Sequence, residues 1–203
     1  MIPLPVRPQA QSPQRESSVS AVYVLPLGDL AADILDAIDD GIQQVFGLEV
    51  RRLNAEQTPG YAYDTTRAQY SSELILRALI KHCPAEALRL LAITDVDLFI
   101  PMLTFVYGQA QLNGRVSVVS TARMHQEFYS LIRNRPLMLN RVRKEAVHEL
   151  AHTFGLTHCP LPLCPMSIAT GIDQLDGKGD ALCAGCVHLL RDALAGIVRT
   201  HYE

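Results

Sequence analysis

The sequence predicts an α/β fold (α+β in detail) built on a mixed sheet, and three observations lead to this expectation. Between residues 21 and 93, short apolar runs alternate with stretches whose apolar residues recur every three or four positions, which is typical of strands alternating with helices. Asn113-Gly114 then separates two β-prone runs, which favours an antiparallel hairpin. Beyond residue 155 the chain is rich in proline and glycine and ends in another helical pattern.

The first elements follow from short apolar patterns. Residues 1–19 are rich in Pro, Gln and Ser and predict a flexible arm. Residues 21–25 predict a buried strand, and residues 48–53 predict a second one. Between them an apolar stripe predicts a helix that Gly47 ends. The stripe consists of Leu30, Ile34, Leu35, Ile38, Ile42, Val45 and Phe46.

A second helix and three further strands are expected next. The second helix carries an amphipathic pattern that Pro84 closes, and residues 90–93 predict the third strand. The hairpin strands are expected at residues 104–110 and 116–120, with one of the two at an edge of the sheet. The apolar positions of the second helix are Tyr70, Leu74, Ile75, Ala78 and Leu79.

Two more helices are expected in the last third of the chain. One runs from Pro136 to Phe154, and the other covers residues 187–198, after a loop-like stretch. The final helix is expected to turn four residues inward: Leu189, Leu190, Leu194 and Ile197. The patterns thus change along the chain: residues 1–19 form the arm, residues 20–154 carry the expected strands and most of the helices, and residues 155–203 are loop-rich and end in a helix.

Composition excludes several classes of function. The 203 residues are 48% hydrophobic and 19% charged, with a formal net charge of −3, so no large basic field exists for nucleic acid. Arg141, Arg143 and Lys144 form the densest basic group, which we interpret as a solvated helix face. No export signal or membrane-spanning stretch is visible, so a cytoplasmic protein that binds neither nucleic acid nor membrane is expected.

His148-Glu149-Leu150-Ala151-His152 is an HExxH motif within a helical pattern. Residues four apart lie on the same helix face, so both imidazoles can reach one metal ion, while Glu149 is offset and can bond water on that ion. The alternative is a pair of surface histidines beside a solvated glutamate. The apolar Val147, Leu150 and Ala151 argue against that alternative, because they predict a buried segment.

Gly155 and His158 extend the motif to HExxHxxGxxH. The helix must stop and turn before a third ligand can face the same ion, and glycine supplies the left-handed backbone that such a turn needs. Three protein ligands leave a position for water, which is typical of a catalytic zinc site. The motif therefore predicts zinc on His148, His152 and His158, with Glu149 as general base in hydrolysis.

Four of the five cysteines fall within 28 consecutive residues. Cys159, Cys164, Cys183 and Cys186 match a closed tetrahedral zinc site, which would hold the loop-rich segment in place. Two disulfides, or free buried thiols, are the alternatives. Cys83 stands alone before Pro84 and is expected to be a buried structural residue.

Together these motifs resemble the archaemetzincins, a branch of the metzincin metallopeptidases. The matching residues are His148, Glu149, His152, Gly155, His158, Cys159, Cys164, Met166, Cys183 and Cys186. The match covers residues 148–186, and its one departure is the spacer of 16 residues between Met166 and Cys183, one shorter than the family pattern.

The resemblance implies a metzincin-like fold with two lobes around a cleft. The upper lobe would hold a mixed twisted sheet and the active-site helix, and the lower lobe would be small, loop-rich, clipped by zinc and closed by a helix. The resemblance further implies a catalytic zinc on the three histidines, a structural zinc on the four cysteines, and Met166 in the tight turn beneath the catalytic metal. The resemblance also implies a sheet-edge strand along the cleft, for which residues 104–110 are the candidate; they would pair with an extended substrate, and Gly108 would let it approach. The alternative is that residues 104–110 form an interior strand.

The leading hypothesis is thus a zinc metallopeptidase that acts on peptides or proteins, on short peptides or chain termini in particular. Its alternatives are a zinc-stabilised binding or scaffold protein with little catalysis, and a zinc hydrolase of non-peptide amides. The presence of Glu149 argues against a scaffold, because metal binding alone does not require it. His82, His125, His188 and His201 lack ligand spacing and are not expected to bind metal.

Overall fold

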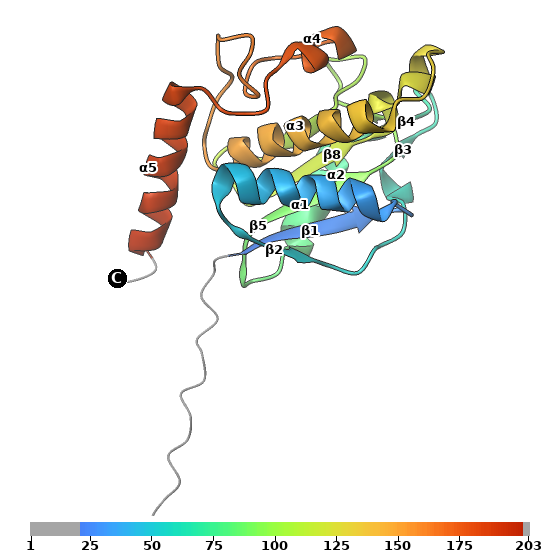
Figure 1. Cartoon of the computed structure of the whole chain (residues 1–203). Helices are drawn as coiled ribbons and strands as arrows, with labels where there is room; N and C mark the ends of the chain where they lie inside the picture. Colours follow the sequence, from blue (N-terminus) through green and yellow to red (C-terminus); the bar gives the residue numbers. More distant parts are fainter. Residues whose placement is uncertain (1–20, 201–203) are drawn as a thin grey trace, which may run out of the picture.

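The computed structural model describes residues 21–200, which form strands and helices around one five-stranded sheet (Figure 1). The expected arm and His201 lie outside these residues. The strands are β1 Ala21–Leu27, β2 Glu49–Arg52, β3 Tyr63–Asp64, β4 Gln69–Ser71, β5 Ala87–Thr94, β6 Leu98–Phe99, β7 Gly108–Ala110 and β8 Val116–Ser120. The α-helices are α1 Ala32–Phe46, α2 Ser72–His82, α3 Arg135–Thr153, α4 Ile172–Gly177 and α5 Ala184–Thr200, and short 3-10 turns are η1 Gly60–Ala62, η2 Ala122–Met124 and η3 Gln126–Tyr129.

The main sheet is mixed, as the sequence predicts. Its strand order is β2-β1-β5-β8-β7, with β1 parallel to β2 and β5, and β5 parallel to β8. The last strand, β7, pairs antiparallel with β8, which confirms the hairpin. Asn113 in its turn has φ of 52°, and its amide donates to the carbonyl of His152 over 2.9 Å. The turn of the hairpin is thereby tied to the end of α3.

The edge strand is shorter than expected. Only Gly108–Ala110 form a strand paired with β8. The Tyr107 carbonyl still accepts the Ser120 amide over 2.8 Å, but residues 104–106 do not continue that ladder. The reason is that Val106 turns away to bridge Leu98, whose carbonyl accepts the Val106 amide over 2.9 Å. Leu98–Phe99 in turn belongs to a small sheet of order β3-β4-β6 that the sequence patterns do not predict.

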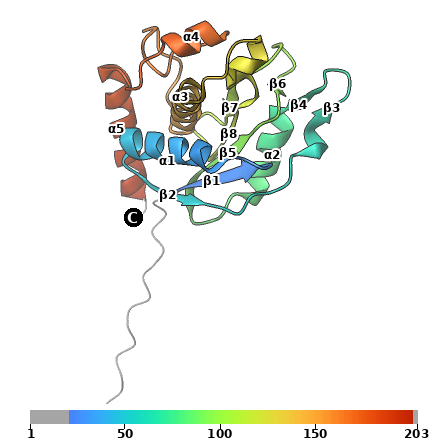
Figure 2. The same ribbon diagram turned by 45° about the vertical axis from the view of Figure 1, so that its right-hand side comes forward.

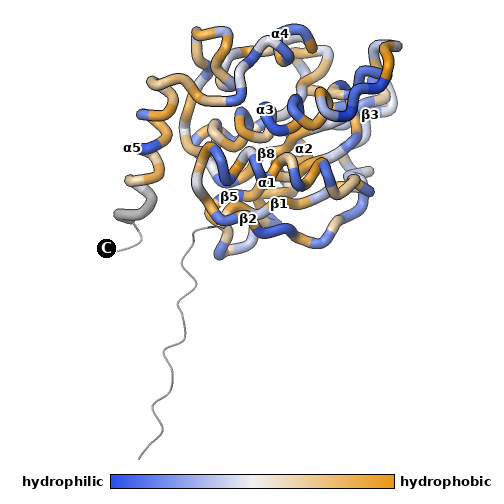
Figure 3. Tube along the Cα trace, in the orientation of Figure 1, coloured by the Kyte–Doolittle hydropathy of each residue, from blue (hydrophilic) through white to orange (hydrophobic). Residues whose placement is uncertain are grey.

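Helices cover both faces of the main sheet. Helices α1 and α3 lie side by side over one face, and α2 covers the other (Figures 1 and 2). The hydrophobic residues gather along the central strands and the inward stripes of these helices (Figure 3). Two apolar layers therefore sandwich the sheet, as expected of a sheet buried on both faces.

The first two helices differ in how closely they follow the sequence patterns. Helix α1 ends at Gly47, which has the expected positive φ of 65°. Helix α2 begins later than predicted, because the Ser71 side chain caps it by accepting from the Leu74 amide. Tyr70, which we expected on this helix, instead pairs with Tyr63 and Leu98 in β4.

The region after α3 is irregular, as expected, but it contains the short helix α4. Helix α5 then starts at Ala184, three residues earlier than predicted. Leu190 on this helix is buried and Leu194 is half-buried, whereas Leu189 is exposed, contrary to expectation, because it lies one residue off the stripe. The Ile197 side chain lies outside the described part. Within residues 21–200, no helix is long and apolar enough to cross a membrane.

The basic group on α3 is not the solvated face that we expected. Arg141 is buried, with its guanidinium paired to both carboxylate oxygens of Asp176 at 2.6 Å and donating to the carbonyl of Met124. Lys144 is also buried and donates to the carbonyls of Leu175 and Asp176. Helix α4 lies over this face of α3. Arg141 pairs with the acidic residue Asp176 of α4, and Lys144 donates hydrogen bonds to the carbonyl groups at the C-terminal end of α4.

Candidate metal centre and cysteine cluster

The three motif histidines converge on one point. His148 and His152 lie one turn apart on α3, and their Nε2 atoms are 3.1 Å from each other. One ligand nitrogen from each of His148, His152 and His158 lies within 4.8 Å of the others. Two nitrogens on a tetrahedral zinc, each about 2.0–2.1 Å from the ion, would lie about 3.3 Å apart. The separation of the two helix imidazoles thus fits one zinc ion.

The third histidine reaches this point through the predicted glycine turn. Gly155 has φ of 89° and donates its amide to the carbonyl of His152, while the amide of Leu156 reaches back to the carbonyl of Ala151. This pair of hydrogen bonds is the Schellman motif, which ends a helix and reverses the chain. His158 follows it and is exposed, and its ring stacks at 25° to that of His148.

Backbone carbonyls fix the orientation of two imidazoles. The Nδ1 of His148 lies 2.8 Å from the Pro165 carbonyl oxygen, and the Nδ1 of His152 lies 2.6 Å from that of Leu156. Each Nδ1 must carry hydrogen to donate, which leaves the Nε2 lone pairs facing each other. Two lone pairs at 3.1 Å repel unless a cation lies between them, and this arrangement is common in metal-bound histidines.

The histidines are held in their neutral form. Burial lowers the pKa of His148 well below its usual range, and Lys178 and His152 add to this effect. Burial also lowers the pKa of His152 and of His158. A metal ion binds only neutral imidazole, so the lowered pKa values favour binding of a metal ion by these nitrogens over binding of a proton.

Glu149 is buried beside the histidines, and a second glutamate accompanies it. Glu145 lies one turn earlier on α3, and one carboxylate oxygen of each lies within 4.8 Å of a His148 nitrogen. Burial, together with the charge of Glu145, raises the pKa of Glu149 well above its usual range. The i, i+4 spacing to Glu149 could have revealed Glu145 in the sequence.

Gly108 lets the edge strand approach Glu149. A Cβ at this position would lie 2.5 Å from the Cγ of Glu149 and 2.8 Å from the carbonyl oxygen of Val118. We expected the missing side chain to admit substrate, but its immediate effect is to admit the Glu149 side chain.

Replacing Gly108 with Ala is therefore expected to displace Glu149 and lower kcat about 100-fold, because a displacement of about 1 Å at a catalytic group can cost that much. Steady-state kinetics and metal content are the measurements. The metal content should be unchanged, because the three atoms nearest to the added methyl group belong to Glu149 and Val118 and not to a histidine. Gly60→Ala is the matched control, since a Cβ there meets nothing within 4 Å. A kcat for Gly108→Ala equal to that of the control would contradict the close packing.

Two hollows flank the histidine cluster. One, of about 300 Å³, is lined by β7 residues Gly108, Gln109 and Ala110 together with His152 and Thr157. The other, of about 240 Å³, lies between residues 103–108, residues 168–170 and Lys178. His148, Glu149 and His158 line both hollows, so the histidine cluster lies between them in a cleft that the edge strand borders.

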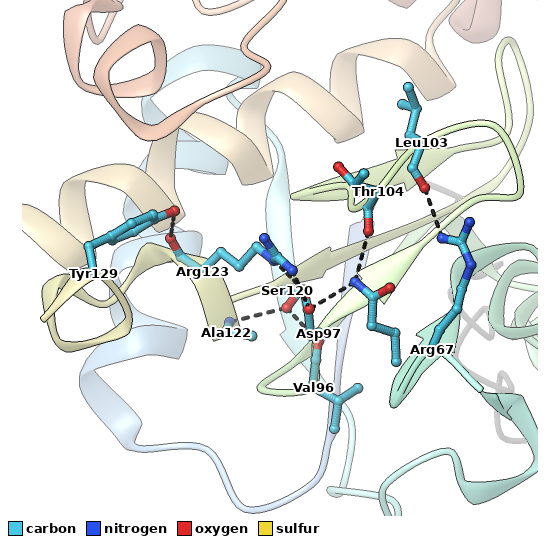
Figure 4. A network of polar contacts seen from close by, with 10 residues as sticks. Arg67, Val96, Asp97, Leu103, Thr104, Ser120, Ala122, Arg123 and Tyr129 are labelled. Carbon is cyan, nitrogen blue, oxygen red and sulfur yellow. Dashed lines mark hydrogen bonds and ion pairs between the residues drawn. The ribbon is translucent and has the colours of Figure 1, made fainter. Parts of the chain in front are cut away.

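A polar network fixes the wall of the second hollow (Figure 4). Asp97 accepts two hydrogen bonds from Arg123, at 2.6 and 2.7 Å, and one from Gln69 at 2.9 Å. Gln69 also donates to the Thr104 carbonyl, and Arg67 donates to the Leu103 carbonyl, both at 2.9 Å. The backbone of residues 103–104 is thereby tied to β4 and to the turn after β8.

Asp97→Asn is expected to loosen this wall and raise KM severalfold, with a smaller effect on kcat, because Asp97 does not contact the histidines. The loss of charge-assisted hydrogen bonds should also cost about 1–3 kcal/mol of stability. Hydrogen exchange at residues 101–107 and steady-state kinetics test this expectation. Asp36→Asn, which breaks the exposed pair with Arg52, is the control. Unchanged hydrogen exchange at residues 101–107 would show that the network does not fix the wall of the hollow.

The four clustered cysteines lie together as two close pairs. Cys159 and Cys183 are 3.8 Å apart at sulfur, as are Cys164 and Cys186. Thiolates about 2.3 Å from a tetrahedral zinc would also lie about 3.8 Å apart, whereas a disulfide joins sulfurs at about 2.05 Å. All four are free and within 4.8 Å of one another. The disulfide alternative is therefore not supported, and the geometry fits one zinc.

Thiolate character is already favoured at one of these cysteines. The backbone amide of Cys186, at the start of α5, donates toward Cys183 and lowers the pKa of its thiol to about 7. The lone Cys83 is half-buried rather than buried, and its thiol faces the Pro84 carbonyl at 3.7 Å.

The turn that contains Met166 joins the two clusters. The amide of Ser167 donates to the carbonyl of Cys164 over 2.9 Å, with Pro165 at the second position of this β-turn. The Pro165 carbonyl orients His148, and the Met166 carbonyl accepts the Cys159 amide. Met166 itself is fully buried in the core next to α3. This tight turn matches the expectation from sequence.

The remaining histidines in the described part stand apart from both clusters. His82 and His188 are exposed and His125 is half-buried, and none of the three belongs to a ligand group. Lys178, which lines the hollow beside Glu149, was not singled out from the sequence, because a lone lysine in a glycine-rich loop carries no pattern.

Comparisons with known proteins agree with the geometry. The model of peptidase family M54 matches residues 30–192. The archaemetzincin of Methanocaldococcus jannaschii is 35% identical over 174 residues, which cover 86% of this chain and 94% of that protein.

Solved structures give the same result. The crystal structure of archaemetzincin from Methanopyrus kandleri superposes with a TM-score of 0.77 at 33% identity, covering 91% of this chain and 99% of that one. A zinc-dependent peptidase from Methanocorpusculum labreanum has a TM-score of 0.72 at 25% identity, with 83% and 99% covered. The metzincin-like fold is thereby confirmed. The chain belongs to the archaemetzincins, the zinc metallopeptidases of family M54.

Proposed function

We propose that His148, His152 and His158 hold the catalytic zinc and that Glu149 is the general base of peptide-bond hydrolysis. The convergence of three imidazoles supports this proposal, since one ligand nitrogen of each lies within 4.8 Å of the others. Zinc in such a site supplies Lewis acidity, which acidifies water and polarises a carbonyl group.

Glu149 would move the proton in this reaction. Its carboxylate takes a proton from the attacking water as the new C–O bond forms, and passes it to the leaving amine nitrogen as the C–N bond breaks. Burial supports this role, because a carboxylate with a raised pKa is a stronger base and can hold the proton between the two steps.

The four cysteines would hold a second, structural zinc. The two sulfur separations of 3.8 Å support this assignment, and four thiolates leave no position for water. This site would keep the segment that carries His158 and the Pro165 carbonyl in place beneath the catalytic metal. The chain would then divide at Gly155 into an upper lobe (20–154) and a lower lobe (155–203).

The substrate would be a peptide or protein segment in extended form, taken from short peptides or chain termini. Strand β7 is the last strand of the sheet and borders the hollow beside His152, so an extended backbone could add to it. The cytoplasmic location expected from the sequence stays a prediction.

A peptide library and a metal count test this function together. The zinc-loaded protein is expected to cleave some members of the library, and cleavage should stop with a chelator. Elemental analysis is expected to give two zincs per chain. Absence of cleavage across the library would contradict the proposal, and cleavage of non-peptide amides alone would assign the chemistry to a different substrate.

A further inference from the structure

Three cations lie buried between α3 and the segment around α4, and one of them differs from the others. Arg141 and Lys144 have the acceptors described above. Lys178 is 4% exposed, yet within residues 21–200 its ammonium has no ion pair within 4.0 Å and no hydrogen-bond acceptor. A buried cation without a direct partner is costly, so its place in the fold needs another reason.

The Lys178 side chain lines the 240 Å³ hollow beside the metal centre. His148, Glu149 and His158 line the same hollow, which puts Lys178 next to the site where a peptide would be cut. Aromatic and aliphatic residues, among them Phe105 and Ile168, make the walls. A liquid water occupies about 30 Å³, so the hollow has room for a side chain of several heavy atoms.

The charges around this hollow favour an anion once zinc is present. Lys178 interacts at longer range with Glu145 and Glu149, the two carboxylates that line the hollow. A divalent ion on the histidines together with the Lys178 ammonium outweighs these two carboxylates and leaves one net positive charge. The remaining walls are apolar or neutral, so Lys178 is the group in this hollow that can pair with an incoming anion.

We propose that Lys178 is a specificity-determining residue that pairs with a carboxylate of the peptide substrate beside the bond to be cut. This inference rests on the proposed function, because it assumes a peptide in the cleft. The carboxylate has two sources, an Asp or Glu side chain or the free C-terminus of a short peptide. Either would give a direct partner to an ammonium that has none within residues 21–200.

Matched substrates test the pairing without any change in the protein. Peptides identical except for Glu or Gln, placed on either side of the cut bond, are compared by kcat/KM, and each is made with a free and an amidated C-terminus. A charge-assisted hydrogen bond in a partly buried site predicts a preference for Glu, or for the free C-terminus, of about tenfold. A preference for Glu over Gln identifies a side chain as the source of the carboxylate, and a preference for the free over the amidated C-terminus identifies the chain end.

Variants then assign the preference to Lys178. Lys178→Met is expected to abolish the tenfold preference, and Lys178→Arg should keep a part of it. Lys81→Met, which removes an exposed lysine on α2, is the matched control. It should change neither kcat/KM nor the preference between the matched peptides. The same Glu and Gln peptides are also titrated calorimetrically against the zinc-loaded protein carrying Glu149→Gln, so that affinity is measured without turnover.

The outcomes separate this inference from the proposed function. If native protein cuts none of the peptides, the proposed function fails. If native protein prefers neither Glu over Gln nor a free over an amidated C-terminus, the inference is overturned. The same holds if Lys178→Met lowers kcat/KM for all of these peptides equally, because Lys178 then only supports the fold. Should Lys178→Met fail to fold, the native comparison and Lys178→Arg still decide.

Discussion

Glu149→Gln is expected to lower kcat by about 100-fold to 10,000-fold, the range that a general base contributes, and to leave both metals in place. The amide is close in size to the carboxylate, so the packing against Gly108 should persist. It cannot accept a proton from water, and this is the step that the variant removes. Turnover of a peptide and elemental analysis of zinc are the two measurements.

The control for this variant is Glu73→Gln, which removes an exposed carboxylate in the first turn of α2 and should have no effect. Retained turnover in Glu149→Gln would remove Glu149 from the mechanism. Loss of turnover together with loss of one zinc would instead show that the residue supports the metal site, so the metal count decides how the kinetic result is interpreted.

The parts of the fold that could be predicted from sequence are those with local signals. The stripe from Ile34 to Phe46 and Gly47 gave helix α1 and its end, and Asn113-Gly114 gave the β7–β8 hairpin. The convergence of the histidines was also local in origin, because helical spacing and one glycine turn bring all three together.

The parts that could not be predicted depend on partners far away in sequence. Tyr70 carries a helical pattern, but its place in β4 is set by Leu98, 28 residues later. Arg141 and Lys144 carry the pattern of a solvated face, but α4, about 30 residues later in the chain, covers them. Lys178 approaches Glu145 and Glu149 only after the chain has passed Cys159, Cys164 and helix α4. Periodicity reports on an element and not on what packs against it.

Replacing both Cys183 and Cys186 with Ser is expected to reduce the zinc content from two to one and to lower the thermal midpoint by about 10 °C or more. A loss of 1 kcal/mol shifts the midpoint of a domain of this size by roughly 2–4 °C, and structural zinc sites contribute several kcal/mol. Cys83→Ser, at the half-buried thiol outside the cluster, is the control.

This double variant is also expected to lose most of its activity, although neither residue lies in the cleft. Cys159 directly follows His158, and Cys164 directly precedes Pro165, whose carbonyl orients His148. Releasing the cysteines frees both attachments, so the third ligand and the orientation of the first should loosen together. Two zincs retained in the variant would show that the cysteines hold no metal. One zinc with full stability and full activity would show that the second metal is not structural, because the loops that carry His158 and Pro165 would then hold their positions without it.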